Sequence, residues 1–279
     1  MTVKQALSRA REVLASANIE APYLEAELLM RHTLKMDRVE FYLELYRELT
    51  PGQYGEFQSY VERRLCNEPV AYIIGHREFY GLELFVNSSV LIPRPESELL
   101  VDKALELVRN RHLSIIADIG TGCGAIAVSL AYNLPQTRIY ATDISSSALE
   151  VALSNCKKHG VEDRVTLLEG DLLDPLPEPV DLIIANLPYV REPELCKVNT
   201  LGFEPSLALN GGSDGLDKIH RLCVRAGEKL RTGGCLLLEI GQGQGEAVTA
   251  FLHNLYPFAG IELIPDLGGM DRVVSISLV

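Results

Sequence analysis

The sequence lacks the features that mark membrane, metal-binding and disulfide-stabilised proteins. No apolar run approaches the roughly 18 residues needed to cross a bilayer. The first residues run into a charged, helix-forming segment rather than an apolar signal core. The six cysteines form no C-x-x-C pair, and no histidine lies at metal-ligand spacing from them. We therefore expect reduced thiols, no metal, no membrane partner and a cytoplasmic location.

Basic side chains are also in short supply. The chain carries 26 Lys and Arg against 38 Asp and Glu, which gives a net charge of −12. Binding to nucleic-acid phosphates depends on counterion release by cationic side chains, so this balance opposes a nucleic-acid partner. A partner that is itself basic fits better, and we expect no direct contact with nucleic acid.

Two patterns follow one another along the 279 residues. Up to about residue 66, apolar residues recur at helical steps of three and four, as in Val3, Ala6, Leu7, Ala10 and Leu14. This pattern predicts a small bundle of four short helices. Residues 78–86 then combine β-forming side chains with a central glycine, which predicts a hairpin between the two halves of the chain.

From residue 95 onward, helical and extended patterns alternate. The predicted helices are 95–111, 125–133, 146–159, 215–230 and 246–255, and the predicted strands are 115–117, 138–142, 165–168, 182–185, 235–240 and 273–278. Such alternation predicts an α/β fold, with a parallel sheet covered by helices on both faces. Residues 190–214 have no clear period, and loops of that length are often functional.

A glycine-rich loop follows the first strand of this region. It consists of Gly120, Thr121, Gly122, Cys123 and Gly124, and an apolar helix begins directly after it. Glycines at such a strand-to-helix turn let the backbone approach a ligand closely. The spacing and the lack of a following lysine disfavour a phosphate-binding P-loop, and G-x-G-x-G differs from the G-x-G-x-x-G of NAD sites. A tight turn without a ligand is the alternative.

Acidic residues follow the next two strands. Asp143 ends the next strand, 23 residues after Gly120. This is near the offset of roughly 20 residues from a glycine loop at which an acidic side chain accepts hydrogen bonds from a ribose. Asp171 lies in an acidic turn where it can receive an adenine amino group, or else be a solvated turn carboxylate. With the glycine loop, these residues indicate an adenosine-containing ligand. S-adenosylmethionine is a candidate because it has no phosphate for the loop to bind.

Asn186, Leu187, Pro188 and Tyr189 come directly after a buried-strand pattern. Ligands of open α/β sheets bind beyond the carboxyl ends of the strands, so this tetrapeptide should border the same ligand. An amide or aromatic amino nitrogen is nearly non-basic and needs acceptors for its two hydrogens, which Asn186 Oδ1 and the Leu187 carbonyl can supply. Pro188 restricts Leu187 to extended angles, and Tyr189 offers a flat face for stacking. An ordinary strand-exit turn is the alternative.

Five segments together carry a resemblance that spans essentially the whole chain. They are residues 68–75 (EPVAYIIG), 78–82 (EFYGL), 90–98 (VLIPRPESE), 118–127 (DIGTGCGAIA) and 186–189 (NLPY). They resemble the HemK-type peptide chain release factor glutamine methyltransferases. The IPRPESE segment is the specific part, because the glycine loop and the N-x-P-Y motif alone occur in many amino methyltransferases. The family usually has N-P-P-Y where this chain has N-L-P-Y.

The resemblance implies an S-adenosylmethionine-dependent protein-(glutamine-N5) methyltransferase in three parts. These are a helical substrate-recognition domain at 1–67, a β-hairpin linker at 68–93 and a class I methyltransferase domain, Rossmann-like with a seven-stranded sheet, at 94–279. The implied reaction methylates the side-chain amide nitrogen of the glutamine in the Gly-Gly-Gln motif of bacterial class 1 release factors. We expect these factors as protein partners, and the enzyme as a monomer.

The resemblance also carries over to individual residues. It places S-adenosylmethionine against Gly120, Thr121, Gly122, Cys123, Gly124, Asp143 and Asn186, with Leu172 beside Asp171 at the adenine wall. Leu187, Pro188 and Tyr189 complete the glutamine pocket with Asn186.

Other substrates and functions stay open at this point. A sister family methylates a glutamine of a ribosomal protein with the same tetrapeptide. The N-L-P-Y spelling also resembles methyltransferases that act on adenine in ribosomal RNA. A non-catalytic S-adenosylmethionine-binding adaptor and an NAD oxidoreductase are readings from other classes.

Overall fold

The computed structural model describes residues 1–197 and 202–278. The chain divides into two compact units, Met1–His76 and Arg77–Val279, which are described separately. The expected linker, residues 68–93, falls partly in each unit. In the described ranges, no helix combines the length and the apolar character needed to span a bilayer.

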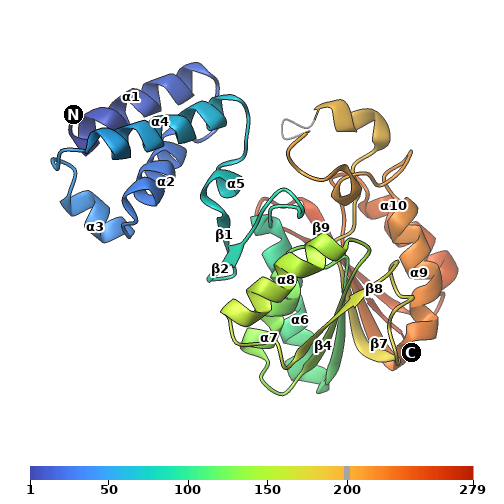
Figure 1. Ribbon diagram of the computed structural model, residues 1–279. Coiled ribbons are helices and arrows are strands. Elements are labelled where there is room, and N and C mark those ends of the chain that lie inside the picture. The colour runs from blue at the N-terminus through green and yellow to red at the C-terminus, as the bar shows by residue number, and fades with distance from the viewer. Residues whose placement is uncertain (198–201, 279) are drawn as a thin grey trace. The chain divides into compact units, whose positions relative to one another are not determined.

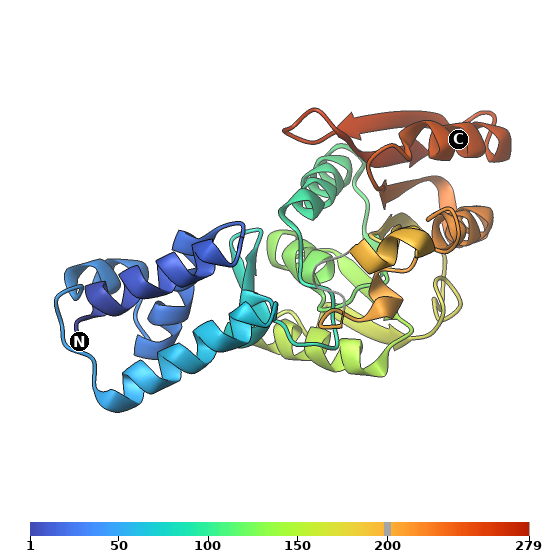
Figure 2. The same ribbon diagram turned by 90° about the horizontal axis from the view of Figure 1, so that it is seen from above.

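The first unit is helical. Its helices are α1 (Val3–Ser16), α2 (Pro22–Leu34), α3 (Arg38–Leu43), α4 (Pro51–Leu65) and α5 (Val70–Ile74). The first four confirm the predicted bundle, whereas α5 was not predicted. Helices α1, α2 and α4 pack against one another (Figures 1 and 2). Leu14, Leu29, Met30, Phe41 and Phe57 are buried between the helices.

Local sequence sets where three of these helices begin. Thr2, Asp37 and Thr50 are N-caps, and each accepts a hydrogen bond from a backbone N–H in the first turn. A Gln or Glu three residues later returns a side-chain acceptor to the backbone N–H of the cap. Such capping boxes satisfy donors that the helix itself leaves unpaired.

The predicted hairpin is confirmed as β1 (His76–Phe79) and β2 (Leu82–Phe85). Tyr80 and Gly81 at its turn have φ of 52° and 72°, as two-residue hairpin turns require. Asn155 joins β2 to the rest of the unit, because its side chain exchanges two hydrogen bonds with the Phe85 backbone, at 2.7 and 2.9 Å. The Asn155 amide also donates to the Cys123 carbonyl at 2.8 Å, so the hairpin supports the glycine loop.

The second unit is built on a seven-stranded sheet with the order β5-β4-β3-β6-β7-β9-β8. The strands are β3 (Ile115–Ile119), β4 (Arg138–Asp143), β5 (Val165–Glu169), β6 (Val180–Ala185), β7 (Leu230–Glu239), β8 (Gly260–Pro265) and β9 (Asp271–Ser277). Strands β3 to β7 pair in parallel, as predicted. The prediction of a wholly parallel sheet is wrong at one edge, where β9 is antiparallel to both neighbours. The connection between β8 and β9 is too short for a crossover, so the two strands form a hairpin.

Helices cover both faces of this sheet (Figure 1). Short η1 (Pro95–Ser97) leads into α6 (Glu98–Arg111), which lies with α7 (Ala125–Asn133) and α8 (Ser146–Lys158) on one face. Helices α9 (Asp217–Lys229) and α10 (Gly245–Leu255) cover the other face. Two short helices, η2 (Glu192–Lys197) and η3 (Ser206–Ala208), interrupt the long connection after β6. Because both faces are covered, most residues of the central strands are apolar and buried.

The pairing of β3 with β6 positions the glycine loop and the tetrapeptide 186–189 relative to one another. Ile119 at the end of β3 lies opposite Ala185 at the end of β6. The loops that follow therefore begin side by side, at the carboxyl edge of the sheet. Chain order reverses here, since β4 and β5 extend the sheet to one side of β3 and β6 and β7 to the other. Open α/β sheets bind ligands at such a switch point.

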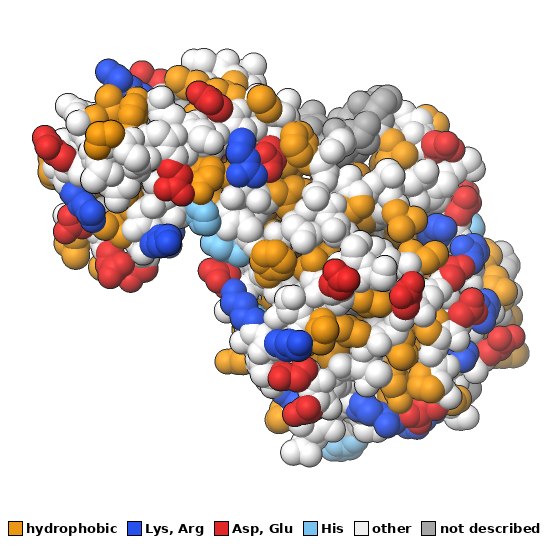
Figure 3. Space-filling model, viewed as in Figure 1, with side chains coloured by type: hydrophobic (Ala, Val, Ile, Leu, Met, Phe, Trp, Pro, Cys, Tyr) orange, Lys and Arg blue, Asp and Glu red, His pale blue; other side chains and the backbone are white. Residues whose placement is uncertain are grey.

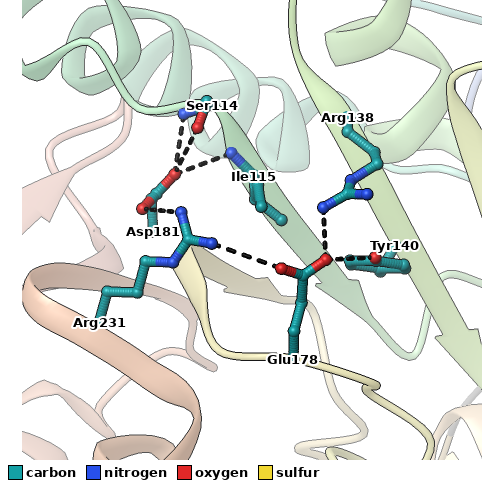
Figure 4. Close-up of polar contacts among 7 residues, drawn as sticks. All are labelled: Ser114, Ile115, Arg138, Tyr140, Glu178, Asp181 and Arg231. Carbon is teal, nitrogen blue, oxygen red and sulfur yellow. Dashed lines mark hydrogen bonds and ion pairs between the residues drawn. The ribbon is translucent and has the colours of Figure 1, made fainter.

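A polar network links the strands at the amino ends of β3 and β6, opposite the carboxyl edge (Figure 4). Asp181 Oδ2 accepts hydrogen bonds from the backbone N–H groups of Ser114 and Ile115, each at 2.9 Å, and Asp181 Oδ1 accepts from Arg231 at 3.1 Å. Burial opposes ionisation of Asp181, but these hydrogen bonds outweigh it and lower the pKa of the carboxyl. The network links the starts of β3 and β6 to Arg231, near the start of β7.

We predict that Asp181→Asn lowers the free energy of unfolding by about 1–2 kcal/mol at pH 7, because it weakens the charge-assisted hydrogen bonds that Asp181 accepts at the amino ends of β3 and β6. A lowered carboxyl pKa stabilises the fold above the unfolded value of about 4. The difference between the wild type and the variant should therefore shrink as the pH falls below 4. Urea unfolding at several pH values measures it.

Asp174→Asn is the matched control, because Asp174 pairs with Arg225 on an exposed surface. Its effect should stay below about 0.5 kcal/mol. Equal losses for the two variants would contradict a special role of the Asp181 network.

Candidate functional site

An open cavity with an empty volume of about 870 Å³ lies at the carboxyl edge of the sheet. This volume includes space that is open to solvent. Predicted site residues that line the cavity are Gly120, Gly122, Asp143, Asp171, Leu172, Asn186, Leu187 and Pro188. A second, smaller cavity adjoins it and is lined in part by Gly120, Thr121, Gly122, Cys123 and Asn186. The structure thus gathers most of the predicted residues in one place.

The glycine loop needs its glycines for different reasons. Gly120, Gly122 and Gly124 have φ of 73°, 56° and 83°, a region that disfavours other residues. A Cβ on Gly120 would lie 3.1 Å from Leu187 Cδ2, whereas a Cβ on Gly122 would meet open space. A Cβ on Gly124 would lie 3.2 Å from Ala152 Cβ on α8. Gly124 lines neither cavity, so the absence of a side chain there allows close packing against α8. The absence of a side chain at Gly122 instead leaves its backbone exposed to the cavity.

A buried carboxylate holds this loop in shape. Asp118 is 1% exposed, and its Oδ2 accepts from Thr121 Oγ1 at 2.6 Å and from the Ala127 backbone N–H at 3.1 Å. Burial raises the pKa of Asp118 to about 6, and the nearby Asp143 carboxylate adds to the rise. The Asp118 side chain thus stabilises the loop through hydrogen bonds and lines neither cavity.

Asp143 connects the loop to the wall of the cavity. Its Oδ2 accepts from the Gly122 backbone N–H and its Oδ1 from the Ser145 backbone N–H, each at 2.9 Å. A carboxylate has about four lone-pair sites, so both oxygens keep capacity to accept from a ligand. Ile144, which is 53% exposed, places an apolar side chain beside this carboxylate.

Asp171 and Leu172 form the far wall. Asp171 is ion-paired with Arg221 on α9, so its carboxylate is held rather than freely solvated. Leu172 has φ of 50°, and its carbonyl accepts from Thr142 Oγ1 at 3.0 Å. A non-glycine residue in this region costs about 1–3 kcal/mol. The hydrogen bond to β4 helps to hold that strained turn, which places the Leu172 side chain at the cavity.

Three residues of the tetrapeptide 186–189 lie at the larger cavity, and the fourth does not. Asn186, Leu187 and Pro188 line the larger cavity, and the Leu187 side chain is buried against Gly120. Tyr189 does not line either cavity. Its hydroxyl donates to Glu239 Oε1 at 3.2 Å, and burial raises the pKa of Tyr189.

The Asn186 side chain has a defined partner. Its Nδ2 donates to Ser97 Oγ at 2.9 Å, and Ser97 itself is buried at the start of α6. Ser97 lies in the IPRPESE segment, so this hydrogen bond joins two separate motifs of the sequence. Because Nδ2 is used by Ser97, the other end of the amide, Oδ1, is left to face a ligand.

An ion pair brings two other distant segments together. Arg94 donates to both carboxylate oxygens of Glu204, at 2.9 and 2.7 Å, and the Ile92 backbone N–H donates to Glu204 Oε1 at 3.1 Å. The Glu204 side chain is fully buried. Pro205 follows it directly and lines the larger cavity. Of the long loop predicted at 190–214, residues 198–201 lie outside the described residues.

Sequence reasoning missed part of the cavity wall. The missed residues are Ser89, Val90, Leu91, Thr142, Ile144, Ser145, Ala148, Gly170, Pro205, Leu207, Ala208 and Lys218. Ile144 was recoverable, since it directly follows Asp143 at the carboxyl end of a strand. Residues 89–91 and 205–208 carry no chemical signature of their own and reach the site only through folding. In residues 1–197 and 202–278, no cluster of three or more His, Cys, Asp or Glu side chains is arranged to hold a metal ion.

Comparison with known proteins extends these observations. Residues 5–75 match the family model described as PrmC N-terminal domain, and residues 96–200 match that of the methyltransferase small domain. The release factor glutamine methyltransferase of Moorella thermoacetica is 43% identical over 274 residues, covering 98% of this chain and 97% of that protein. That of Koribacter versatilis is 39% identical over 279 residues, covering 98% of each.

Solved structures share the fold at low sequence identity. The ribosomal protein L11 methylase of Lactobacillus delbrueckii has a TM-score of 0.51 at 20% identity and covers 68% of this chain and 81% of its own. The human Mettl16 catalytic domain has a TM-score of 0.59 at 16% identity, with coverages of 72% and 77%. The predicted class I methyltransferase fold is thereby confirmed.

The structure predicts unequal reactivity of the described cysteines. Cys66 is exposed, whereas Cys123, Cys156 and Cys223 are buried and burial raises the pKa of their thiols to about 12, 11 and 12. Thiolates are the reactive form, so iodoacetamide at pH 8 should modify Cys66 well before these three. Peptide mass spectrometry of native and urea-unfolded protein measures this. Modification of native Cys123 as fast as Cys66 would contradict its buried position in the glycine loop.

Proposed function

The chain belongs to the release factor glutamine methyltransferase family and is a methyltransferase. On that basis we propose that it transfers a methyl group from S-adenosylmethionine to the side-chain amide nitrogen of the glutamine in the Gly-Gly-Gln motif of bacterial class 1 release factors. The observation that carries the proposal is the Asn186 amide, held through Nδ2 by Ser97 at the wall of both cavities. Its Oδ1 is an acceptor of the kind that a primary amide needs.

The residues of the larger cavity fit S-adenosylmethionine. Backbone at Gly120 and Gly122 is bare enough for close approach of the methionine part, and Asp143 keeps acceptor capacity for the ribose hydroxyls. Asp171 and Leu172 form a wall with one polar and one apolar side for the adenine. When bound, this cofactor supplies an electrophilic methyl group.

The chain itself contributes positioning. Asn186 Oδ1 and the Leu187 carbonyl accept the two hydrogens of the glutamine amide, so the nitrogen lone pair is directed away from both. Pro188 keeps Leu187 in extended angles and so holds that carbonyl in place. The nitrogen becomes acidic once the new C–N bond has formed, and its proton then leaves to water, so no general base is needed. Holding reactants in place can supply about 7–11 kcal/mol of barrier reduction in ideal cases.

Surface charge favours a protein substrate over RNA. On the face of the second unit drawn in Figure 3, acidic and basic side chains are interspersed. Arg221 and Arg225 on α9 are paired with Asp171 and Asp174, so their charge is locally neutralised. With a net charge of −12, the chain offers little for RNA phosphates to bind.

Labelled methyl transfer tests the proposed substrate. Purified class 1 release factor, the same factor with the Gly-Gly-Gln glutamine replaced by alanine, ribosomal proteins and ribosomal RNA are each incubated with enzyme and labelled S-adenosylmethionine. Label should appear in the unaltered release factor, and peptide mass mapping should place it on that glutamine. Label that persists in the alanine variant, or that enters ribosomal protein or RNA instead, overturns the proposal.

We predict that Asn186→Ala lowers turnover by roughly 10²-fold or more, by analogy with removal of one preorganised polar contact. Affinity for S-adenosylmethionine should change much less, because the glycine loop and Asp143 remain. Steady-state kinetics and calorimetric titration separate the two effects. Asn133→Ala, at the exposed end of α7, is the control, and near-normal turnover of Asn186→Ala would refute the assigned role.

We also predict that Gly122→Ala weakens S-adenosylmethionine binding by at least 10-fold. Gly160→Ala is matched to it, since Gly160 has φ of 64° and open space around its Cβ position but lies at the end of α8. Both variants pay a similar backbone cost of about 1 kcal/mol, which thermal unfolding measures. Only Gly122→Ala should lose affinity for the cofactor, and equal affinities would exclude close approach at the loop.

A further inference from the structure

Two segments that are far apart in the sequence form part of the wall of the larger cavity. Residues 89–91 line the cavity and directly precede Ile92. Residues 205–208 directly follow Glu204, and Pro205, Leu207 and Ala208 line the cavity as well. Both segments belong to the second unit, and no predicted site residue lies in either. We call residues 89–91 and 205–208 together the junction wall.

Glu204 joins the two segments through three hydrogen bonds. Its Oε1 accepts from the Ile92 backbone N–H at 3.1 Å and from Arg94 at 2.9 Å, and its Oε2 accepts from Arg94 at 2.7 Å. The Glu204 side chain is fully buried, whereas the Arg94 side chain is 37% exposed. A buried carboxylate is costly unless such partners compensate it. The position of Glu204 therefore depends on Arg94 and on the backbone of Ile92.

The backbone holds the other end of the second segment. The Val190 N–H donates to the Leu209 carbonyl at 3.0 Å, and the Gly211 N–H donates to the Val190 carbonyl at 2.9 Å. These hydrogen bonds attach the chain after η3 to the chain that follows the tetrapeptide. Residues 205–208 therefore lie between a backbone anchor at Val190 and a side-chain anchor at Glu204.

We propose that the Arg94–Glu204 ion pair positions the junction wall against the cofactor and thereby sets the affinity for S-adenosylmethionine. The inference rests on the proposed function, in which this cofactor occupies the larger cavity. Arg94 and Glu204 line neither cavity, so both act as positioning residues. All residues of the junction wall that line the cavity, except Ser89, are apolar. A wall that moves away from the ligand loses apolar contact area, which weakens binding.

The proposal separates cofactor affinity from turnover. The glycine loop and the tetrapeptide are placed by the pairing of β3 with β6, which does not involve Glu204. Release of the junction wall therefore leaves the acceptors at Asn186 and Leu187 in place. Cofactor affinity should fall, while turnover at saturating cofactor should change little.

Glu204→Gln tests the role of the charge without a change of shape. Both oxygens of Glu204 face N–H donors, whereas a glutamine amide has one oxygen and one NH₂ group. In either orientation of the amide, the NH₂ group faces a donor of Arg94 or Ile92. The variant therefore loses the ionic attraction and at least one hydrogen bond.

We expect Glu204→Gln to raise the Kd for S-adenosylmethionine about 10- to 100-fold, because one partner of a buried ion pair is lost. The kcat at saturating cofactor should change less than about 3-fold, since the acceptors stay in place. Calorimetric titration without release factor measures Kd, and steady-state kinetics measure kcat. Arg94→Gln removes the charge from the partly exposed partner and should also raise Kd. It decides by the same criterion if Glu204→Gln does not fold.

Asp266→Asn is the matched control. Asp266 also accepts from backbone N–H groups and from an arginine, Arg272, in the second unit, but it lines neither cavity. This variant should keep the Kd of the wild type. A loss of folded protein lowers kcat and the number of binding sites but leaves Kd unchanged, so Kd separates positioning from general stability. An unchanged Kd in Glu204→Gln, or an equal rise in Asp266→Asn, overturns the proposal.

A double-mutant cycle tests whether Arg94 and Glu204 act as a pair. Each single substitution removes the same ion pair, so Arg94→Gln should add little to the rise in Kd that Glu204→Gln causes. Rises in Kd that multiply would mean that the two residues act separately, which overturns the ion pair as the positioning element.

A readout without ligand keeps the inference distinct from the proposed function. The chain has no tryptophan, and Leu207 in the junction wall is 52% exposed, so Leu207→Trp introduces a single fluorophore there. Acrylamide should quench this tryptophan about 1.5-fold more strongly or more when Glu204→Gln is added, because a segment that loses an anchor opens more often. Addition of Asp266→Asn should not change the quenching.

The two readouts fail in different ways. Equal quenching with and without Glu204→Gln overturns the role of the ion pair even if release factor is methylated. A wild type that binds no S-adenosylmethionine, or that methylates no release factor, overturns the proposed function. The quenching then still decides whether the ion pair holds the junction wall.

Discussion

The in-register parallel pairing of β3 with β6 is the constraint on which the functional site depends. It ends both strands at the same level, so that the glycine loop and the tetrapeptide leave the sheet as neighbours. The closeness has a steric consequence, because a Cβ on Gly120 would lie 3.1 Å from the Leu187 side chain. Loop and tetrapeptide therefore form one surface, and a Cβ at position 120 would require the Leu187 side chain to shift.

Carboxylates beneath and behind the cavity hold this surface in shape. Asp118 holds the glycine loop, Glu204 joins the IPRPESE segment to the loop that precedes Pro205, and Glu239 lies behind Asn186 and Tyr189. Burying a charge is expensive unless hydrogen bonds or ion pairs compensate it. Asp118 and Glu204 have such partners and are thereby committed to one geometry, whereas Glu239 accepts, among the described residues, from Tyr189 at one oxygen only. The result is a site whose acceptors are placed before any ligand arrives, as catalysis by positioning requires.

The two edges of the sheet have different tasks. At the amino edge, Asp181 and Glu178 link neighbouring strands through backbone N–H groups and arginines (Figure 4), and they line neither of the two cavities described above. At the carboxyl edge, Asp143 uses part of its hydrogen-bonding capacity on the loop and keeps the remainder for a ligand. Stability is concentrated where function does not need accessible polar groups, which leaves the carboxyl edge open.

Local pattern was enough to establish much of this molecule. Helical periodicity identified α1 to α4, and a β-rich run around Gly81 identified the hairpin. Short apolar segments between the predicted helices located β3 to β7, because strands that are buried on both faces are nearly continuously apolar. The glycine loop, Asp143 and the tetrapeptide were recognisable because each follows a strand within a few residues. The sequence did not reveal β8, and without β8 it could not reveal the direction of β9. That direction follows from the short connection that joins the two strands as a hairpin.

Contacts between distant segments lay beyond reach of the sequence. Ser97 with Asn186, Arg94 with Glu204, and Glu239 with Tyr189 each join residues 50 or more positions apart. Glu239 ends an ordinary buried strand, and its contact with Tyr189 arises because the neighbouring strand β6 leads into the tetrapeptide beside it. The chain thus dictates by itself its elements and the short motifs that end its strands, because those follow from local periodicity and backbone restriction. Which acceptor faces the cavity depends on hydrogen bonds that exist only after the sheet has brought its strands together.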